Sequence, residues 1–187
     1  MNLMPSLAPA WRNAWLMLLP MLASGVLVSA RRKDVAKRLS SMTGYTGKEK
    51  LVTVTASLLP YPFMGVAIVT PLRAVGVLLF LGVLSSLIGS IGFAATLHVF
   101  ANTPDEQPLQ AGPFRLSRNP LYVSAALVFA GVCLATGSLL LAGILAILLM
   151  LQHFMILAEE RACRSKYGEV YLSYSRKRPR YLGWTRD

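Results

Sequence analysis

The chain has 187 residues, of which 55% are hydrophobic and only 14% are charged. That balance is unusual for a soluble protein of this size, and the apolar residues lie in long blocks with almost no charge. The formal charge of +11 would suggest a nucleic-acid partner in a soluble protein. Here the basic residues gather in alternate loops between the apolar blocks, which indicates membrane topology and argues against nucleic-acid binding.

The apolar blocks match the length of membrane-spanning helices. A bilayer core requires roughly 20 helical residues. Most of the blocks fit this length, and the first and fourth are a little short. The sequence therefore predicts an all-α integral membrane bundle of about five transmembrane helices. We expect a single membrane domain over residues 1–187, with spans at about 14–30, 51–70, 72–97, 120–136 and 138–158.

The distribution of lysine and arginine predicts the orientation of these spans. Of the 19 basic residues, seven lie in 31–50, two in 98–120 and eight in 161–187. Only Arg12 and Arg73 lie in the other loops. Because cytoplasmic loops carry the excess of basic residues, we expect the N-terminus outside and the C-terminus in the cytoplasm. This topology would suit the inner or plasma membrane of a prokaryote. The sequence predicts no metal site.

Two spans carry residues that affect helix geometry. The span at 51–70 contains Pro60 and Pro62, which remove backbone donors, so this helix should bend or break there. The third span has a stripe of small residues that allows a neighbouring helix to approach closely. This stripe predicts packing and comprises Gly82, Ser85, Ser86, Gly89 and Gly92.

The loop from Asn102 to Asn119 is the polar interruption that carries chemical interest. At its end, Asn119 can cap the fourth span and Pro120 suits the first helical position. Arg115 and Arg118 can lie at the headgroup level. A helix N-terminus in this place can also bind a carboxylate or phosphate. The short turn at 136–138 then predicts a tight antiparallel hairpin of the last two spans.

Glu159 and Glu160 lie at the inner end of the last span, where every nearby ionisable residue is basic. Ionisable groups at the membrane are costly, so a functional role and an ion pair are equally good interpretations. The candidate partners are Arg161, Arg164, Arg115 and Arg118. His153, almost two turns deeper, could face the same cavity or serve as a packing residue.

The basic tail carries three tyrosines at helical spacing, Tyr167, Tyr171 and Tyr174. Such tyrosines are typical of the membrane interface, and we expect that role for them. Gly168 should weaken the helix in this region.

A pocket would form if residues 103–122 and Glu159 converge at the cytoplasmic end of the last hairpin. It would open to water for a polar cosubstrate and sideways to the bilayer for a lipid substrate. Residues alone do not name the cosubstrate.

The motif residues Gly112–Arg115 and Arg118–Tyr122, followed after a hairpin by Glu-Glu-x7-Gly-x2-Tyr at 159–171, are distinctive as a pair. Together they resemble the superfamily of isoprenylcysteine carboxyl methyltransferases and phospholipid methyltransferases. The resemblance covers about 105–180 and places the catalytic region at about 102–180.

The resemblance implies a membrane methyltransferase that uses S-adenosylmethionine without a Rossmann domain. It implies that Glu159 orients the cofactor, and we hypothesise that Glu160 or His153 assists the acceptor, with Arg115 and Arg118 near the substrate. The cofactor-binding positions matched to the family are Gln107, Pro108, Leu109, Phe114, Asn119, Pro120, Leu121, Tyr122 and Glu159.

Two departures from the family pattern bear on the acceptor. Asn119 stands where the family usually has histidine; it keeps hydrogen bonding and loses imidazole chemistry. Met155 stands where the isoprenylcysteine enzymes have an arginine, so a prenylcysteine carboxylate would need Arg115, Arg118 or Arg161 instead. A phospholipid amine such as phosphatidylethanolamine is therefore favoured, entering from the bilayer. The alternatives are an NADPH-dependent sterol-type reductase and a non-catalytic membrane protein with this architecture.

Overall fold

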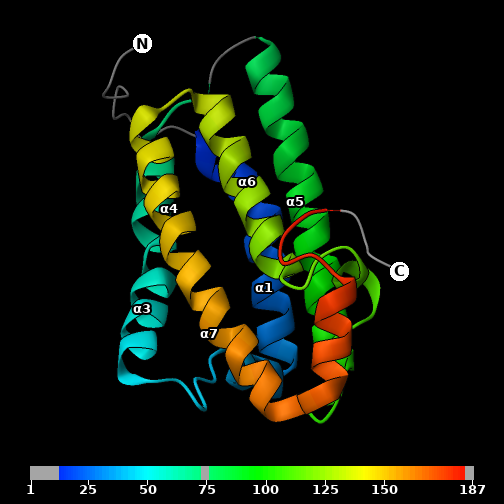
Figure 1. The fold of residues 1–187 in the computed structure, drawn as a ribbon. Coiled ribbons are helices and arrows are strands. Elements are labelled where there is room, and N and C mark those ends of the chain that lie inside the picture. The colour runs from blue at the N-terminus through cyan, green and yellow to red at the C-terminus, as the bar shows by residue number, and fades with distance from the viewer. Residues whose placement is uncertain (1–12, 73–75, 184–187) are drawn as a thin grey trace.

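A computed structural model describes residues 13–72 and 76–183 of the chain (Figure 1). Arg12 and Arg73, the two basic residues expected on the outer side, lie outside the described residues. The described elements are helical, and no strand occurs among them. They are η1 (Ala14–Leu18), α1 (Leu19–Arg31), α2 (Lys33–Leu39), α3 (Gly47–Leu58), α4 (Pro60–Val69), α5 (Val77–Asn102), η2 (Gly112–Arg115), α6 (Pro120–Thr136) and α7 (Leu139–Lys177).

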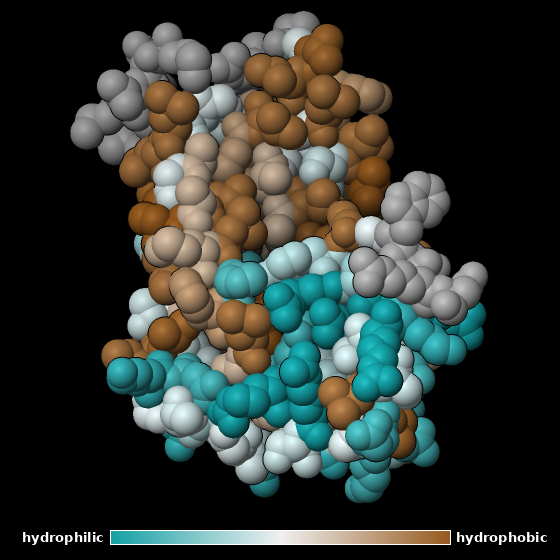
Figure 2. Space-filling view, viewed as in Figure 1, coloured by the Kyte–Doolittle hydropathy of each residue, from teal (hydrophilic) through white to brown (hydrophobic). Residues whose placement is uncertain are grey.

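Five helical segments run along the long axis of the molecule. Four are long and apolar enough to cross a membrane: η1 with α1, α3 with α4, α5, and α7. The shorter apolar helix α6 is the fifth. Figure 2 shows apolar side chains over most of this length and a polar band at one end. We call that end, formed by α2, residues 103–119 and the C-terminal part of α7, the polar end. The all-α membrane bundle is thus confirmed.

The helix break in the second span is at the expected place. α3 ends at Leu58 and α4 begins at Pro60, which occupies a first-turn position where its missing N–H is not needed. The Leu59 N–H still donates to Thr55 O at 3.2 Å, so the chain continues in nearly the same direction.

Small residues bring α5 and α6 into close contact, as the stripe predicts. A Cβ on Gly82 would lie 2.5 Å from Gly131 O, and one on Gly89 would lie 2.6 Å from Ser124 O. Ser85 Oγ uses this proximity to donate to Leu127 O at 2.9 Å. Without a hydrophobic driving force between helices in lipid, such contacts are a main source of association. They fix the two helices that lead into and out of the 103–119 loop.

Two glycines reverse the chain around α7. Gly137 adopts φ 62°, and Ser138 Oγ then accepts a hydrogen bond from Leu141 N at the start of α7. This closes the predicted α6–α7 hairpin. Gly168 has φ 54° and ψ −132° inside α7, a conformation that favours glycine. The chain turns sharply there, and its last part returns along the polar end toward α6 (Figure 1).

Candidate active site

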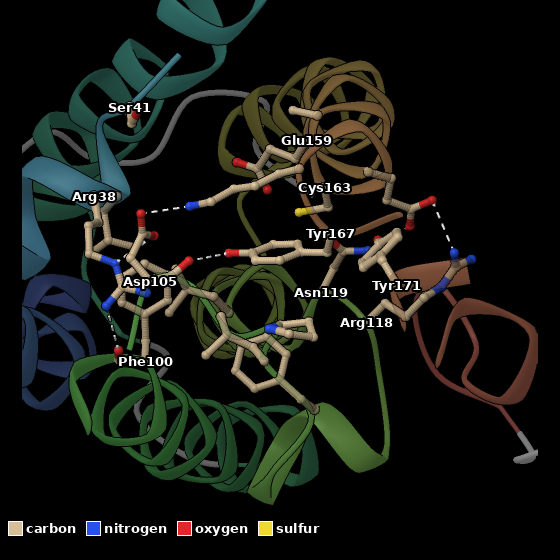
Figure 3. A pocket seen from close by; sticks show the side chains of 18 of the residues that line it. Arg38, Ser41, Phe100, Asp105, Arg118, Asn119, Glu159, Cys163, Tyr167 and Tyr171 are labelled. Atoms are coloured by element: carbon tan, nitrogen blue, oxygen red, sulfur yellow. Dashed lines mark hydrogen bonds and ion pairs between the residues drawn. The ribbon is translucent and has the colours of Figure 1, made fainter. Parts of the chain in front are cut away.

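A pocket of about 670 Å³ opens at the polar end, where segments far apart in sequence converge. Its volume is in the range of small-molecule sites. The walls come from residues 37–45, the end of α5, the 105–109 stretch with η2, the start of α6 and α7. The expected convergence of the 103–122 region with Glu159 therefore occurs. Figure 3 shows Arg38 and Asp105 on one side of the pocket and Arg118 on the other, with Tyr167 and Tyr171 between them.

Glu159 and Tyr122 form a hydrogen-bonded pair on the pocket wall. The Tyr122 hydroxyl donates to Glu159 Oε1, and both residues line the pocket. Glu159 has no cationic partner within ion-pair distance among the described residues. Its second oxygen and its negative charge are therefore available to a ligand.

Glu160, in contrast, is enclosed in an ionic cluster. Arg118 Nη1 donates to its Oε2 at 3.2 Å, and Arg180 donates to both oxygens, at 3.1 and 3.0 Å. Asn119 Nδ2 adds a further hydrogen bond to Oε1 at 3.1 Å, and the Glu160 side chain is only 4% exposed. Since each carboxylate oxygen already has two donors, Glu160 is poorly placed to assist an acceptor. The ion-pair interpretation describes it better, with Arg180 as an additional partner.

Asn119 lies at the N-cap position of α6, but its side chain does not cap the helix. It donates instead to Glu160 Oε1 and to Arg180 O, each at 3.1 Å. The capping role that the sequence indicates is therefore wrong. Pro120 does occupy the first helical turn, and Leu121 lines the pocket beside it.

His153 lies apart from the pocket. Its Nδ1 is 2.6 Å from the Tyr181 hydroxyl, and it is not among the residues that line the cavity. The structure therefore gives His153 a contact with the C-terminal tail where sequence reasoning placed it near the acceptor. Arg115 and Gln107 are also exposed away from the lining, whereas Arg118 contributes to it. Pro108 and Leu109 line the pocket, as expected for this stretch.

Asp105 anchors the 105–109 stretch, and sequence reasoning missed it. Its carboxylate accepts from Arg38 Nε at 3.1 Å and from Lys166 Nζ at 2.6 Å. The Tyr167 hydroxyl donates to the Asp105 backbone oxygen at 2.9 Å. The hydrogen bond from Lys166 and the nearby cations lower the pKa of Asp105 below its usual value, against a smaller effect of burial. Asp105 thus connects α2, the 103–119 loop (the motif loop) and α7.

Residues 37–45, which we call the α2 wall, close the pocket from a segment to which the sequence gave only a topological role. Arg38 donates to the Phe100 and Thr103 carbonyls and lies 4.6 Å from the Phe100 ring centroid. Arg161 on α7 reaches across to Gly44 O and to Glu49. The basic residues of this loop are the feature in the sequence that could have pointed to these contacts. The positive-inside rule accounts for them fully, so nothing in the sequence indicated a contact with the pocket.

The tail tyrosines line the pocket, and two of them are buried in it. Tyr171 and Tyr174 are 6% and 7% exposed and line the pocket. The Tyr174 hydroxyl donates to Phe114 O at 2.7 Å, which ties the last part of α7 to η2. The turn at Gly168 places them there, so the expected role at the membrane interface does not describe Tyr171 and Tyr174, which pack inside the pocket.

The pocket combines aromatic surface, one unpaired carboxylate and cations. Phe114, Tyr122 and Tyr171 provide flat apolar surface, and Glu159 provides negative charge. Arg118 Nε is buried without a hydrogen-bond partner among the described residues. A buried unsatisfied donor is costly, which marks this guanidinium as a group that a ligand oxygen would stabilise. Such a lining suits a zwitterionic molecule with an aromatic base and a positive centre.

Residues 68–170 match the family model described as "Phospholipid methyltransferase". The chain belongs to the phospholipid methyltransferase family. The match covers more than half of the chain and includes α5, the motif loop, α6 and most of α7. Comparisons with curated proteins and with solved structures give no match.

Membership of the phospholipid methyltransferase family supports a membrane protein of the methyltransferase type. It also divides the pocket. Phe114, Tyr122 and Glu159 lie inside the matched region. The α2 wall, the last tyrosines and Arg180 lie outside it. Of these, the α2 wall, Tyr171 and Tyr174 line the cavity, and Arg180 contacts it only through Glu160.

Proposed function

We propose that this protein transfers a methyl group from S-adenosylmethionine to a membrane-embedded, lipid-like acceptor. The observation that carries the proposal is the Glu159–Tyr122 pair on an aromatic pocket wall in a chain of this family. The pocket lies at the polar end of the bundle, whose remaining length is apolar (Figure 2), and this placement suits one water-soluble and one lipid partner.

The residues of the wall fit the parts of the cofactor. Phe114 and the neighbouring tyrosines offer stacking surface for the adenine ring. Glu159 offers a carboxylate for a positive centre, and Arg118 offers a donor for a carboxylate. Pro108, Leu109, Asn119, Pro120 and Leu121 supply the surrounding surface.

S-adenosylmethionine, when bound, supplies a methyl group on a positively charged sulfonium. The residues of the chain then have to orient the acceptor and exclude water from the pocket. An amine acceptor must also lose a proton. Glu159 is the lining carboxylate without a cationic partner among the described residues, so we assign the proton to its free oxygen. Glu160 is too fully hydrogen-bonded for this step.

A phospholipid amine such as phosphatidylethanolamine is the acceptor that we favour over an isoprenylcysteine-type carboxylate. Met155, at the position of the arginine in the isoprenylcysteine enzymes, is 5% exposed and does not line the pocket. A thioether offers no charge to a carboxylate. Arg161, a candidate substitute, is already bound to Glu49.

The polar end is proposed to face the cytoplasm. It carries α2 and the C-terminal part of α7 with their basic residues, and the positive-inside rule assigns such an end to that side. The N-terminus would then lie outside.

Calorimetric titration of the purified protein in detergent micelles tests the proposal. We expect saturable binding of S-adenosylmethionine and none of NADPH. Glu159→Gln should lower the rate of methyl transfer to phosphatidylethanolamine by roughly a hundredfold or more. Glu169→Gln, an exposed glutamate on the same helix, is the matched control and should behave as the unaltered protein. Folded protein that binds no S-adenosylmethionine would refute the proposal, and methylation of a prenylcysteine acceptor alone would change the substrate.

A further inference from the structure

The C-terminal segment after α7 folds back onto the start of α6, outside the region that the family model matches. The Arg118 N–H donates to Pro179 O at 2.9 Å. Ser117 Oγ and Asn119 Nδ2 donate to Arg180 O at 3.2 and 3.1 Å. Residues 117–119 are thus hydrogen-bonded to a segment about sixty positions away in sequence.

The side chain of Arg180 strengthens this connection through Glu160. Its Nε and Nη2 donate to the two carboxylate oxygens, a bidentate arrangement with high geometric specificity. The same two oxygens accept from Asn119 Nδ2 and Arg118 Nη1. We call Arg118, Asn119, Glu160 and Arg180 the tail latch. Glu160 is its centre, and two of its members, Arg118 and Asn119, belong to the cofactor-binding wall proposed above.

We propose that Arg180 is a positioning residue of the active site, acting through Glu160 on Arg118 and Asn119. This inference rests on the proposed function, because it concerns residues proposed to bind the cofactor. Arg180 itself need not touch cofactor or acceptor. It fixes the rotation of the Glu160 carboxylate, and this rotation sets the direction in which the amide and the guanidinium are held.

The surroundings of the tail support a positioning role. Tyr181 follows Arg180 and is paired with His153 on α7, 2.6 Å from its Nδ1. His153 therefore gains a function in holding the tail. The segment is bound on both sides of Arg180, so its guanidinium reaches Glu160 with little freedom. A lysine in this place could supply charge but not two parallel hydrogen bonds.

Three variants in detergent micelles test the inference: Arg180→Met, Arg180→Lys and, as a control, Arg176→Met. Arg176 is an exposed arginine near the end of α7. The measurements are the dissociation constant of S-adenosylmethionine by calorimetry, the melting temperature, and KM and kcat with phosphatidylethanolamine. We expect Arg180→Met to weaken cofactor binding at least about tenfold, the loss that follows from one charge-assisted hydrogen bond. KM for the lipid should change little.

The lysine variant separates positioning from general stability. We expect Arg180→Lys to recover most of the melting temperature while cofactor binding stays weakened, because charge returns without bidentate geometry. Unchanged binding in Arg180→Met, or binding that recovers in parallel with melting temperature in Arg180→Lys, would overturn the inference. If the unaltered protein binds no S-adenosylmethionine, the proposed function fails, and the inference fails with it. Binding by the unaltered protein with no effect of Arg180 refutes the inference alone.

Discussion

Two carboxylates on opposite sides of the pocket form ion pairs in very different surroundings. Asp105 pairs with Arg38 and Lys166, and its side chain is 53% exposed. Glu160 pairs with Arg118 and Arg180, and its side chain is only 4% exposed. The first set holds the α2 wall and the second is the tail latch. Exposed ion pairs contribute little and are screened by salt. A buried charge that loses its partner is strongly destabilising. Similar contacts therefore predict an adjustable wall and a fixed one.

The fixed wall includes Arg118 and Asn119, which we propose bind the cofactor, and the adjustable wall lies on the opposite side of the pocket (Figure 3). Arg161 and Glu49 add a second exposed pair on the α2 side, with side chains 48% and 25% exposed. Three measurements break or sharpen the contrast.

The largest effect is expected for Glu160→Ala. It leaves two arginines facing each other in a buried site, which should lower the free energy of unfolding by about 3–5 kcal/mol. Unfolding in mixed micelles with increasing dodecyl sulfate measures this. Glu169→Ala is the control, because Glu169 is exposed and should change stability by less than about 0.5 kcal/mol. Equal losses in the two variants would show that the tail latch is no more fixed than the surface.

A smaller effect is expected for Asp105→Asn. Removing the carboxylate breaks both of its exposed ion pairs, and the loss should be within about 1 kcal/mol at low salt. At about 1 M salt the difference in stability from the unaltered protein should nearly vanish, because the Debye length falls to about 3 Å and exposed charges are then almost fully screened. Glu106→Gln is the neighbouring control. A loss that persists in high salt would place Asp105 with the tail latch in its energetics.

The smallest effect is the pH dependence of the α2 wall. The pKa of Asp105 is lowered in the folded protein, mainly by the hydrogen bond from Lys166. Its contribution to the free energy of unfolding is therefore fully present above the pKa of the unfolded chain, about 3.9. This contribution is lost as the pH falls through the lower pKa of the folded protein. The melting-temperature difference between the unaltered protein and Asp105→Asn should be constant from about pH 7 to 5 and shrink below about pH 4. A difference that grows on acidification would contradict this sign.

Several features of the fold and site were accessible from the sequence. Apolar block lengths predict the helices, and Pro60 and Gly137 mark a break and a turn that the structure contains. The motif pair at 112–122 and 159–171 indicates the family and brings attention to Glu159 and Tyr122, which are hydrogen-bonded. These features depend on residues that are close together in the chain, so they can be recognised from the order of residues alone.

Other features depended on contacts between distant segments. The sequence could not show that Glu160 is enclosed by ion pairs while Glu159 is not, since adjacent residues on a helix point about 100° apart and meet different neighbours. Arg38 has the same sequence signature as any topogenic arginine, yet it binds Asp105. Arg180 and Tyr181 lie beyond the quoted motif residues, and only the contacts of this segment with Asn119 and His153 connect it to the site.

The sequence by itself determined an all-α membrane bundle, its family and the stretch of chain that carries the motif, because hydrophobic length, helix-breaking residues and motif spacing are properties of the chain in order. Tertiary structure decided which of two neighbouring glutamates is free and which is enclosed. It also decided that the α2 wall and the tail complete the pocket. The turn at Gly168 and the close packing of α5 on α6 bring these segments together, and hydrogen bonds across sixty residues are fixed only once the helices have packed.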